Sequence, residues 1–159
     1  MRFGLALLLA LGMSALAFSP SMAQDEKIEK RFGLLLEAEV YPQTTPKELQ
    51  ASILKVLKRE RYDYLVAHMM EPTFVDQRLQ STRTTAEQLG KEIKGKFEAQ
   101  PELLKDLNKL LLDGEMTDAG TKATLKHKDV KNQQVFMKKV GERWYVENRM
   151  KEEKSAEKE

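Results

Sequence analysis

The side chains best suited to proton transfer lie close together, at Asp63, Tyr64 and His68. Tyr64 and His68 are four residues apart, so a helix would place both on the same side. In a water-poor cavity, burial changes the proton affinity of such groups and lets them act as a general acid or base. Each also has a more common structural role: Asp63 as a helix cap, Tyr64 as a core aromatic, and His68 as a hydrogen-bonded, half-buried histidine.

Other kinds of catalytic site lack the residues they need. The chain has 159 residues with no cysteine and two histidines, which excludes thiolate metal sites, a thiol nucleophile and a three-histidine metal site within one chain. It contains neither a glycine-rich phosphate loop nor a G-x-S-x-G elbow. Its acidic residues do not have the sequence spacing of metal ligands. We therefore predict no metal and no cofactor, and we favour a non-catalytic protein.

The first 23 residues have the pattern of a secretory signal peptide. Arg2 gives a positive start, residues 3–18 form an uncharged apolar run, and Ser21 and Ala23 are small residues at the positions that a signal peptidase reads. The alternative is an uncleaved membrane anchor, but 16 residues fall short of the roughly 20 that span a bilayer. We expect cleavage after Ala23, export to the periplasm or the extracellular space, and no stable membrane anchor afterwards.

The net charge of the chain does not indicate a particular binding partner. The chain has 27 basic and 25 acidic residues, and the leader contributes only Arg2, so the mature protein has a formal charge near neutrality. Residues 114–149 are modestly basic, but Asp129 and Glu142 interrupt their lysines. Because nucleic-acid affinity grows with the number of phosphates neutralised, we predict no nucleic-acid binding and assign these lysines to the solvated surface.

Helical spacing dominates as far as Gly114. Thr45, Pro46 and Glu48 have the types and spacing of a capped helix start. We expect Asp63 to cap a short helix over residues 64–70 and residues 73–80 to add another helical turn. Thr84 or Thr85 then caps the next helix, Pro101 opens the last one, and Gly114 ends it in a left-handed conformation. The apolar stripes are Leu49, Ile53, Val56 and Leu57; Leu89, Ile93 and Phe97; and Leu103, Leu104, Leu107, Leu110 and Leu111.

After Gly114 the apolar period falls to about two, which is typical of strands. We expect strands over residues 121–127, 133–140 and 143–148, a loop at 128–132, and a type II′ turn at Gly141-Glu142. The fold class is therefore α+β, with N-terminal helices packed on a C-terminal antiparallel meander. We divide the chain into the signal peptide, an arm over 24–43 that forms either helix or an edge strand, a single domain over 44–149, and a disordered charged tail over 150–159.

Two segments carry a family resemblance. Residues 45–48 with the step Arg61-Tyr62-Asp63-Tyr64, and the hairpin over residues 138–144 with its glycine turn before Trp144, resemble the nuclear-transport-factor-2-like superfamily of cystatin-like, cone-shaped α+β domains. Segments around Tyr41, His68, residues 71–76 and Trp144 also look like a set of uncharacterised exported bacterial proteins, which have no assigned activity.

The resemblance implies a cone whose pocket or sheet face binds a ligand or a partner. Our leading hypothesis is an exported binding module for a small apolar ligand or a protein partner, with Tyr64, His68, Trp144 and Asn148 as candidate ligand-binding residues. As a structural residue, Trp144 would instead anchor the sheet on the helices. Two alternatives stay open: a cone-type isomerase or dehydratase that uses His68 with Asp63 or Tyr64, and a structural subunit that forms a homodimer through its sheet.

Overall fold

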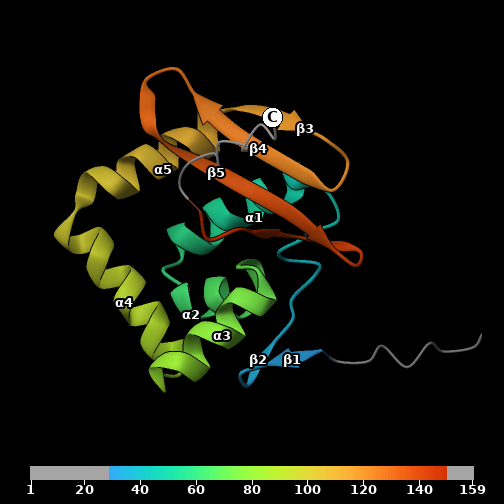
Figure 1. The fold of residues 1–159 in the computed structure, drawn as a ribbon, viewed down its shortest axis with the longest axis vertical. Helices are drawn as coiled ribbons and strands as arrows, with labels where there is room; N and C mark the ends of the chain where they lie inside the picture. The colour runs from blue at the N-terminus through green and yellow to red at the C-terminus, as the bar shows by residue number, and fades with distance from the viewer. Residues whose placement is uncertain (1–28, 150–159) are drawn as a thin grey trace, which may run out of the picture.

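The structure, a computed structural model, describes residues 29–149. The signal peptide expected at residues 1–23, its cleavage site after Ala23 and the charged tail at 150–159 lie outside the described residues. The helices precede a four-stranded antiparallel sheet and pack on one of its faces (Figure 1). The predicted α+β class is confirmed.

Helix α1, Pro46–Lys58, begins as its sequence predicts. Thr45 accepts a hydrogen bond from the Glu48 amide, and the Glu48 carboxylate accepts one from the Thr45 amide, so two amides at the helix start are satisfied. The predicted stripe of this helix is buried and forms the centre of the core beneath the sheet. The members of the stripe are Leu49, Ile53, Val56 and Leu57.

The second helical segment differs from the prediction. It begins at α2, Tyr62–Tyr64, and continues as the π-helical turn η1, Leu65–Met69, in which the Met70 amide bonds to the Leu65 carbonyl. Asp63 does not cap it: the residue at the cap position is Arg61, and the Asp63 carboxylate accepts a hydrogen bond from the adjacent Tyr64 amide. The cap prediction was wrong because the chain turns into the helix two residues earlier.

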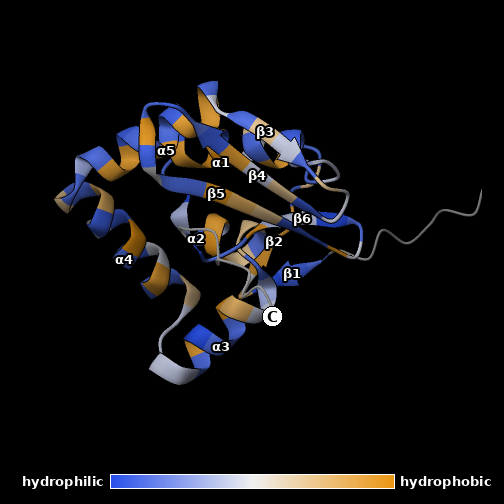
Figure 2. Ribbon diagram, turned by 45° about the horizontal axis from the view of Figure 1, so that its top comes forward, coloured by the Kyte–Doolittle hydropathy of each residue, from blue (hydrophilic) through white to orange (hydrophobic). Residues whose placement is uncertain are grey.

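Three further helices follow, α3 (Pro72–Thr82), α4 (Ala86–Ala99) and α5 (Pro101–Asp113). Thr85 caps α4 and Pro101 opens α5, as predicted. Helices α4 and α5 meet at a sharp bend at Gln100, and each has an apolar side and a hydrophilic side (Figure 2).

Two glycines in this helical region allow close packing. Gly90 lies so near α2 that a Cβ atom there would stand 2.9 Å from the Asp63 amide nitrogen. Gly114 is extended, with φ −69° and ψ 143°, so the predicted left-handed stop was wrong. A Cβ at Gly114 would meet the Leu110 carbonyl and the Leu125 side chain, and this crowding, not a positive φ, accounts for the glycine.

The sheet has the order β3 (Glu115–Asp118), β4 (Lys122–His127), β5 (Val130–Val140) and β6 (Arg143–Val146). Strand β3 was not predicted, since its residues show little apolar alternation. The expected loop at 128–132 is a tight turn at Lys128-Asp129, and β5 already starts at Val130. Gly141 has φ +60° and Glu142 has no positive φ, which fits the predicted type II′ turn.

The described part of the arm forms its own two-stranded ribbon instead of an edge strand of the main sheet. Strands β1 (Lys30–Arg31) and β2 (Leu34–Leu35) pair with each other. Arg31 fastens the ribbon to the helices by donating to the Ala67 and Pro72 carbonyls and to the Asp76 carboxylate. No helix within residues 29–149 has the length and hydropathy that crossing a bilayer requires.

Candidate functional site

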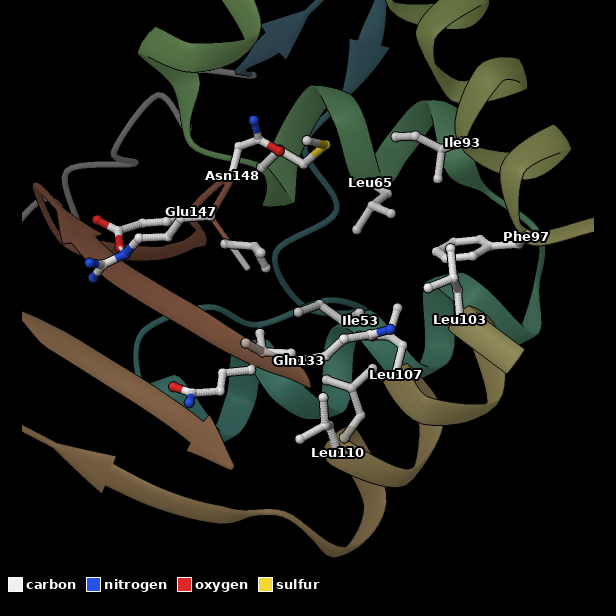
Figure 3. Close-up of a pocket in the computed structure, with 16 residues that line it drawn as sticks. Ile53, Leu65, Ile93, Phe97, Leu103, Leu107, Leu110, Gln133, Glu147 and Asn148 are labelled. Carbon is white, nitrogen blue, oxygen red and sulfur yellow. Dashed lines mark hydrogen bonds and ion pairs between the residues drawn. The ribbon is translucent and has the colours of Figure 1, made fainter. Parts of the chain in front are cut away.

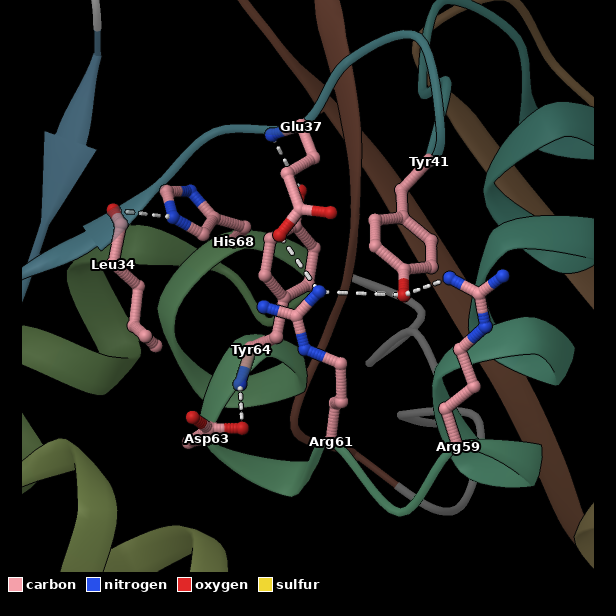
Figure 4. Close-up of polar contacts among 8 residues, drawn as sticks. All are labelled: Leu34, Glu37, Tyr41, Arg59, Arg61, Asp63, Tyr64 and His68. Carbon is pink, nitrogen blue, oxygen red and sulfur yellow. Dashed lines mark hydrogen bonds and ion pairs between the residues drawn. The ribbon is translucent and has the colours of Figure 1, made fainter.

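Tyr64 and His68 belong to a closed polar and aromatic cluster between η1 and the arm (Figure 4). The Tyr64 ring lies 4.7 Å from the Tyr41 ring and 4.8 Å from the His68 ring, measured between centroids, which is the range of favourable aromatic contact. The Arg61 guanidinium lies 4.7 Å above the Tyr64 ring and donates to the Glu37 carboxylate at 2.7 Å.

Most polar side-chain atoms of this cluster have hydrogen-bond partners within the protein. The Tyr64 hydroxyl accepts a hydrogen bond from the Glu37 amide at 3.0 Å, and His68 Nε2 lies 3.1 Å from the Leu34 carbonyl oxygen of the ribbon. Because a carbonyl can only accept, Nε2 carries the proton and Nδ1 is the free acceptor. His68 Nδ1 is buried with no hydrogen-bond partner in the described structure.

Burial controls the protonation of both residues. Tyr64 is 0% and His68 is 1% exposed. Burial lowers the pKa of His68 below its usual value; the Leu34 carbonyl opposes this change and the positive charge of Arg143 adds to it. Burial likewise raises the pKa of Tyr64. Both groups are therefore held neutral, and neither lines the apolar pocket described next.

An apolar pocket lies on the other side of η1, between the α4–α5 pair and the edge of the sheet (Figure 3). Its volume is about 240 Å³. Leu65 enters it from η1, Ile93 and Phe97 from α4, and Leu107 from α5, so apolar side chains of the helices converge on one space. The other apolar lining residues are Ile53, Met70, Leu103, Leu110, Leu111, Val135 and Val146.

The sheet side of the pocket supplies its polar groups. Gln133, Gln134 and Val135 are consecutive on β5, yet all three line the pocket, whereas a regular strand turns alternate residues to opposite faces. The pairing of β4 with β5 explains this. Leu125 pairs with Val135 and His127 pairs with Val130, so two residues along β4 correspond to five along β5. Such an irregularity redirects side chains.

A salt bridge and an exposed amide complete the pocket rim. Arg149 Nε donates to the Glu147 carboxylate at 2.6 Å, and its guanidinium lies 4.2 Å from the centre of the Phe136 ring. Asn148 is exposed beside this pair, on the side of the pocket opposite Phe97 (Figure 3). The two charges of the rim therefore neutralise each other.

The structure divides the predicted site residues among four places. Asn148 lines the apolar pocket, Tyr64 and His68 lie in the closed cluster, and Trp144 is a buried core residue whose amide donates to the Gln43 carbonyl. Asp63 lines a surface depression with Lys91 and Lys94, and no hydrogen bond or ion pair joins the described Asp63 and His68 side chains. The three candidate catalytic residues are thus not assembled around one cavity.

Sequence reasoning missed the pocket as a site. Its helical residues were predicted as core stripes, and stripe patterns do not reveal where packing leaves a space. Its glutamines gave no signal either, because polar residues also occur elsewhere in the same strand, at Lys131, Lys138 and Lys139.

Within residues 29–149, no group of three or more His, Asp or Glu side chains is arranged to hold a metal ion. No protein-family model matches the chain, and comparisons with curated proteins and with solved structures find no significant similarity.

Proposed function

We propose that this protein is an exported, non-catalytic binding module that takes a small apolar ligand into the pocket between α4, α5 and the sheet. The observation that carries the proposal is the unfilled apolar space of about 240 Å³. The pocket opens to solvent and is lined mainly by apolar side chains, and an apolar cavity of about 150 Å³ is large enough for benzene.

The partial solvent exposure of the apolar pocket walls supports a ligand that enters from solvent. Ile93, Phe97, Leu103 and Leu107 are only partly buried, although each contributes to an apolar surface. Apolar surface that stays in contact with water costs about 25 cal/mol per Å² relative to burial. A ligand that covers these side chains recovers that free energy.

The closed cluster supports the non-catalytic part of the proposal. His68 and Tyr64 make hydrogen bonds to the backbone of the arm and are sealed from solvent, so a substrate in the pocket has no contact with them. Export is proposed from the leader sequence. The resemblance to nuclear-transport-factor-2-like domains is also part of the proposal, since helices precede a β-meander in this chain and in those domains.

The test is binding of N-phenyl-1-naphthylamine, an uncharged dye that fluoresces in apolar surroundings, to the protein that starts after Ala23. We expect saturable binding of one dye per chain. Leu107→Trp should fill the pocket and weaken binding at least tenfold.

The matched control is Leu112→Trp on the same helix, at a side chain that is 66% exposed and outside the pocket; it should bind the dye normally. The proposal is contradicted if the wild type shows no saturable binding, or if both variants bind equally well.

A further inference from the structure

We infer that the ligand of this pocket is an electrically neutral amphiphile, with an apolar body and one uncharged hydrogen-bonding end such as an alcohol or a primary amide. This inference depends on the proposed function and adds the chemical class of the ligand. The polar groups of the pocket come from β5, where the shifted pairing brings Gln133 and Gln134 to it, and from residues 147–149 after β6.

Neutral side-chain amides supply the uncharged polar groups of the pocket. Gln133 and Asn148 both line it, and each side-chain amide has an acceptor oxygen and an NH₂ donor. A ligand hydroxyl or amide can donate to one of these oxygens and accept from the other NH₂ group.

Charge argues against an ionic ligand. The two charged residues of the pocket, Glu147 and Arg149, bind each other at 2.6 Å. A ligand carboxylate or ammonium group would therefore lose its hydration among leucine side chains without gaining a free counter-charge. The apolar wall opposite the glutamines fits the hydrocarbon end of the ligand.

The experiment is competition against the bound dye with five ligands that share a six-carbon chain: 1-hexanol, hexanamide, hexanoate, hexylammonium and n-hexane. We expect hexanol and hexanamide to bind at least tenfold more tightly than hexanoate and hexylammonium. In Gln133→Leu, which keeps the size of the side chain and removes its hydrogen-bonding groups, hexanol should lose its advantage over hexane.

A second variant tests the role of the paired charges. Glu147→Gln leaves Arg149 without its carboxylate and should strengthen hexanoate binding at least fivefold. An unchanged hexanoate affinity would contradict the inference.

The outcomes separate the inference from the proposed function. If the dye and n-hexane do not bind, the proposed function fails. If the dye and all five ligands bind with similar affinity, the pocket binds apolar ligands but the inference about their polar end is wrong. Preferential binding of hexanoate or hexylammonium to the wild type would also overturn the inference.

Discussion

The two sides of the π-helical turn differ in how completely they are filled. On one side, Tyr64 and His68 pack against Tyr41 and the ribbon with almost no exposed surface. On the other, Leu65 faces a pocket of about 240 Å³. The residues with reactive side chains lie in the filled region, and the open region is lined by residues with little chemistry of their own. This difference favours binding over catalysis.

The π-helical turn itself makes the difference possible. All five residues of η1 are buried, with the closed cluster on one side and the pocket on the other. Its last residue leads into Met70 and Glu71, which bridge to Val146 at the edge of the sheet. The same turn thereby holds the closed cluster and fixes one wall of the pocket.

Removing the Tyr64 ring should have the largest effect on stability. Tyr64→Ala leaves a cavity between Tyr41 and His68, and we expect it to lower the free energy of unfolding by about 3–5 kcal/mol. Tyr64→Phe, which loses only the hydrogen bond from the Glu37 amide, should cost about 1 kcal/mol. Urea denaturation measures both. A loss below 1 kcal/mol for Tyr64→Ala would show that the cluster is not tightly packed.

Helix α4 offers a matched pair of glycines that tests how firmly the pocket wall is held. Gly90→Ala places a methyl group against the α2 backbone, and such overpacking costs about 1–3 kcal/mol. Gly95→Ala meets no atom within 4 Å and should stabilise the protein by up to about 1 kcal/mol through helix propensity. Thermal denaturation of both variants gives the comparison; equal effects would contradict the close approach of α4 to α2.

Acid should weaken the closed cluster through His68. Because the pKa of His68 is lowered in the folded state, the unfolded chain binds a proton more readily below the usual histidine pKa of about 6.5. The contribution of His68 is fully present above that pH and is lost as pH falls toward the folded-state pKa, by at most about 1.4 kcal/mol per pH unit.

Urea denaturation between pH 7.5 and 5 measures this loss. His68→Gln, which cannot take up the proton, should flatten the pH dependence. If wild type and variant lose stability in parallel, His68 is not the group responsible.

The sequence predicted what depends on local pattern. The caps at Thr45 and Thr85, the proline at the start of α5 and the hairpin at Gly141 follow from short-range rules, and all are present. The π-helical turn was not predictable in this way, because its geometry depends on packing around Tyr64 and His68.

The site was harder to predict than the fold. The pairing shift in β5 arises between strands, so neither Gln133 nor Gln134 signalled on its own that it faces a pocket. The sequence places Asp63, Tyr64 and His68 close together along the chain. The direction of each side chain, however, depends on tertiary contacts. Asp63 therefore lies apart from the other two.

Whether the ligand occupies the apolar pocket is tested most directly by an NMR titration of the protein with 1-hexanol. The titration is observed at leucine and valine methyl groups and at tyrosine and histidine rings. We predict saturable shifts at Leu65, Leu107 and Val146, which line the pocket, and no shifts at Tyr64 or His68. Shifts at Tyr64 and His68 with unmoved pocket methyl groups would contradict the account, because the ligand would then occupy the region we describe as closed.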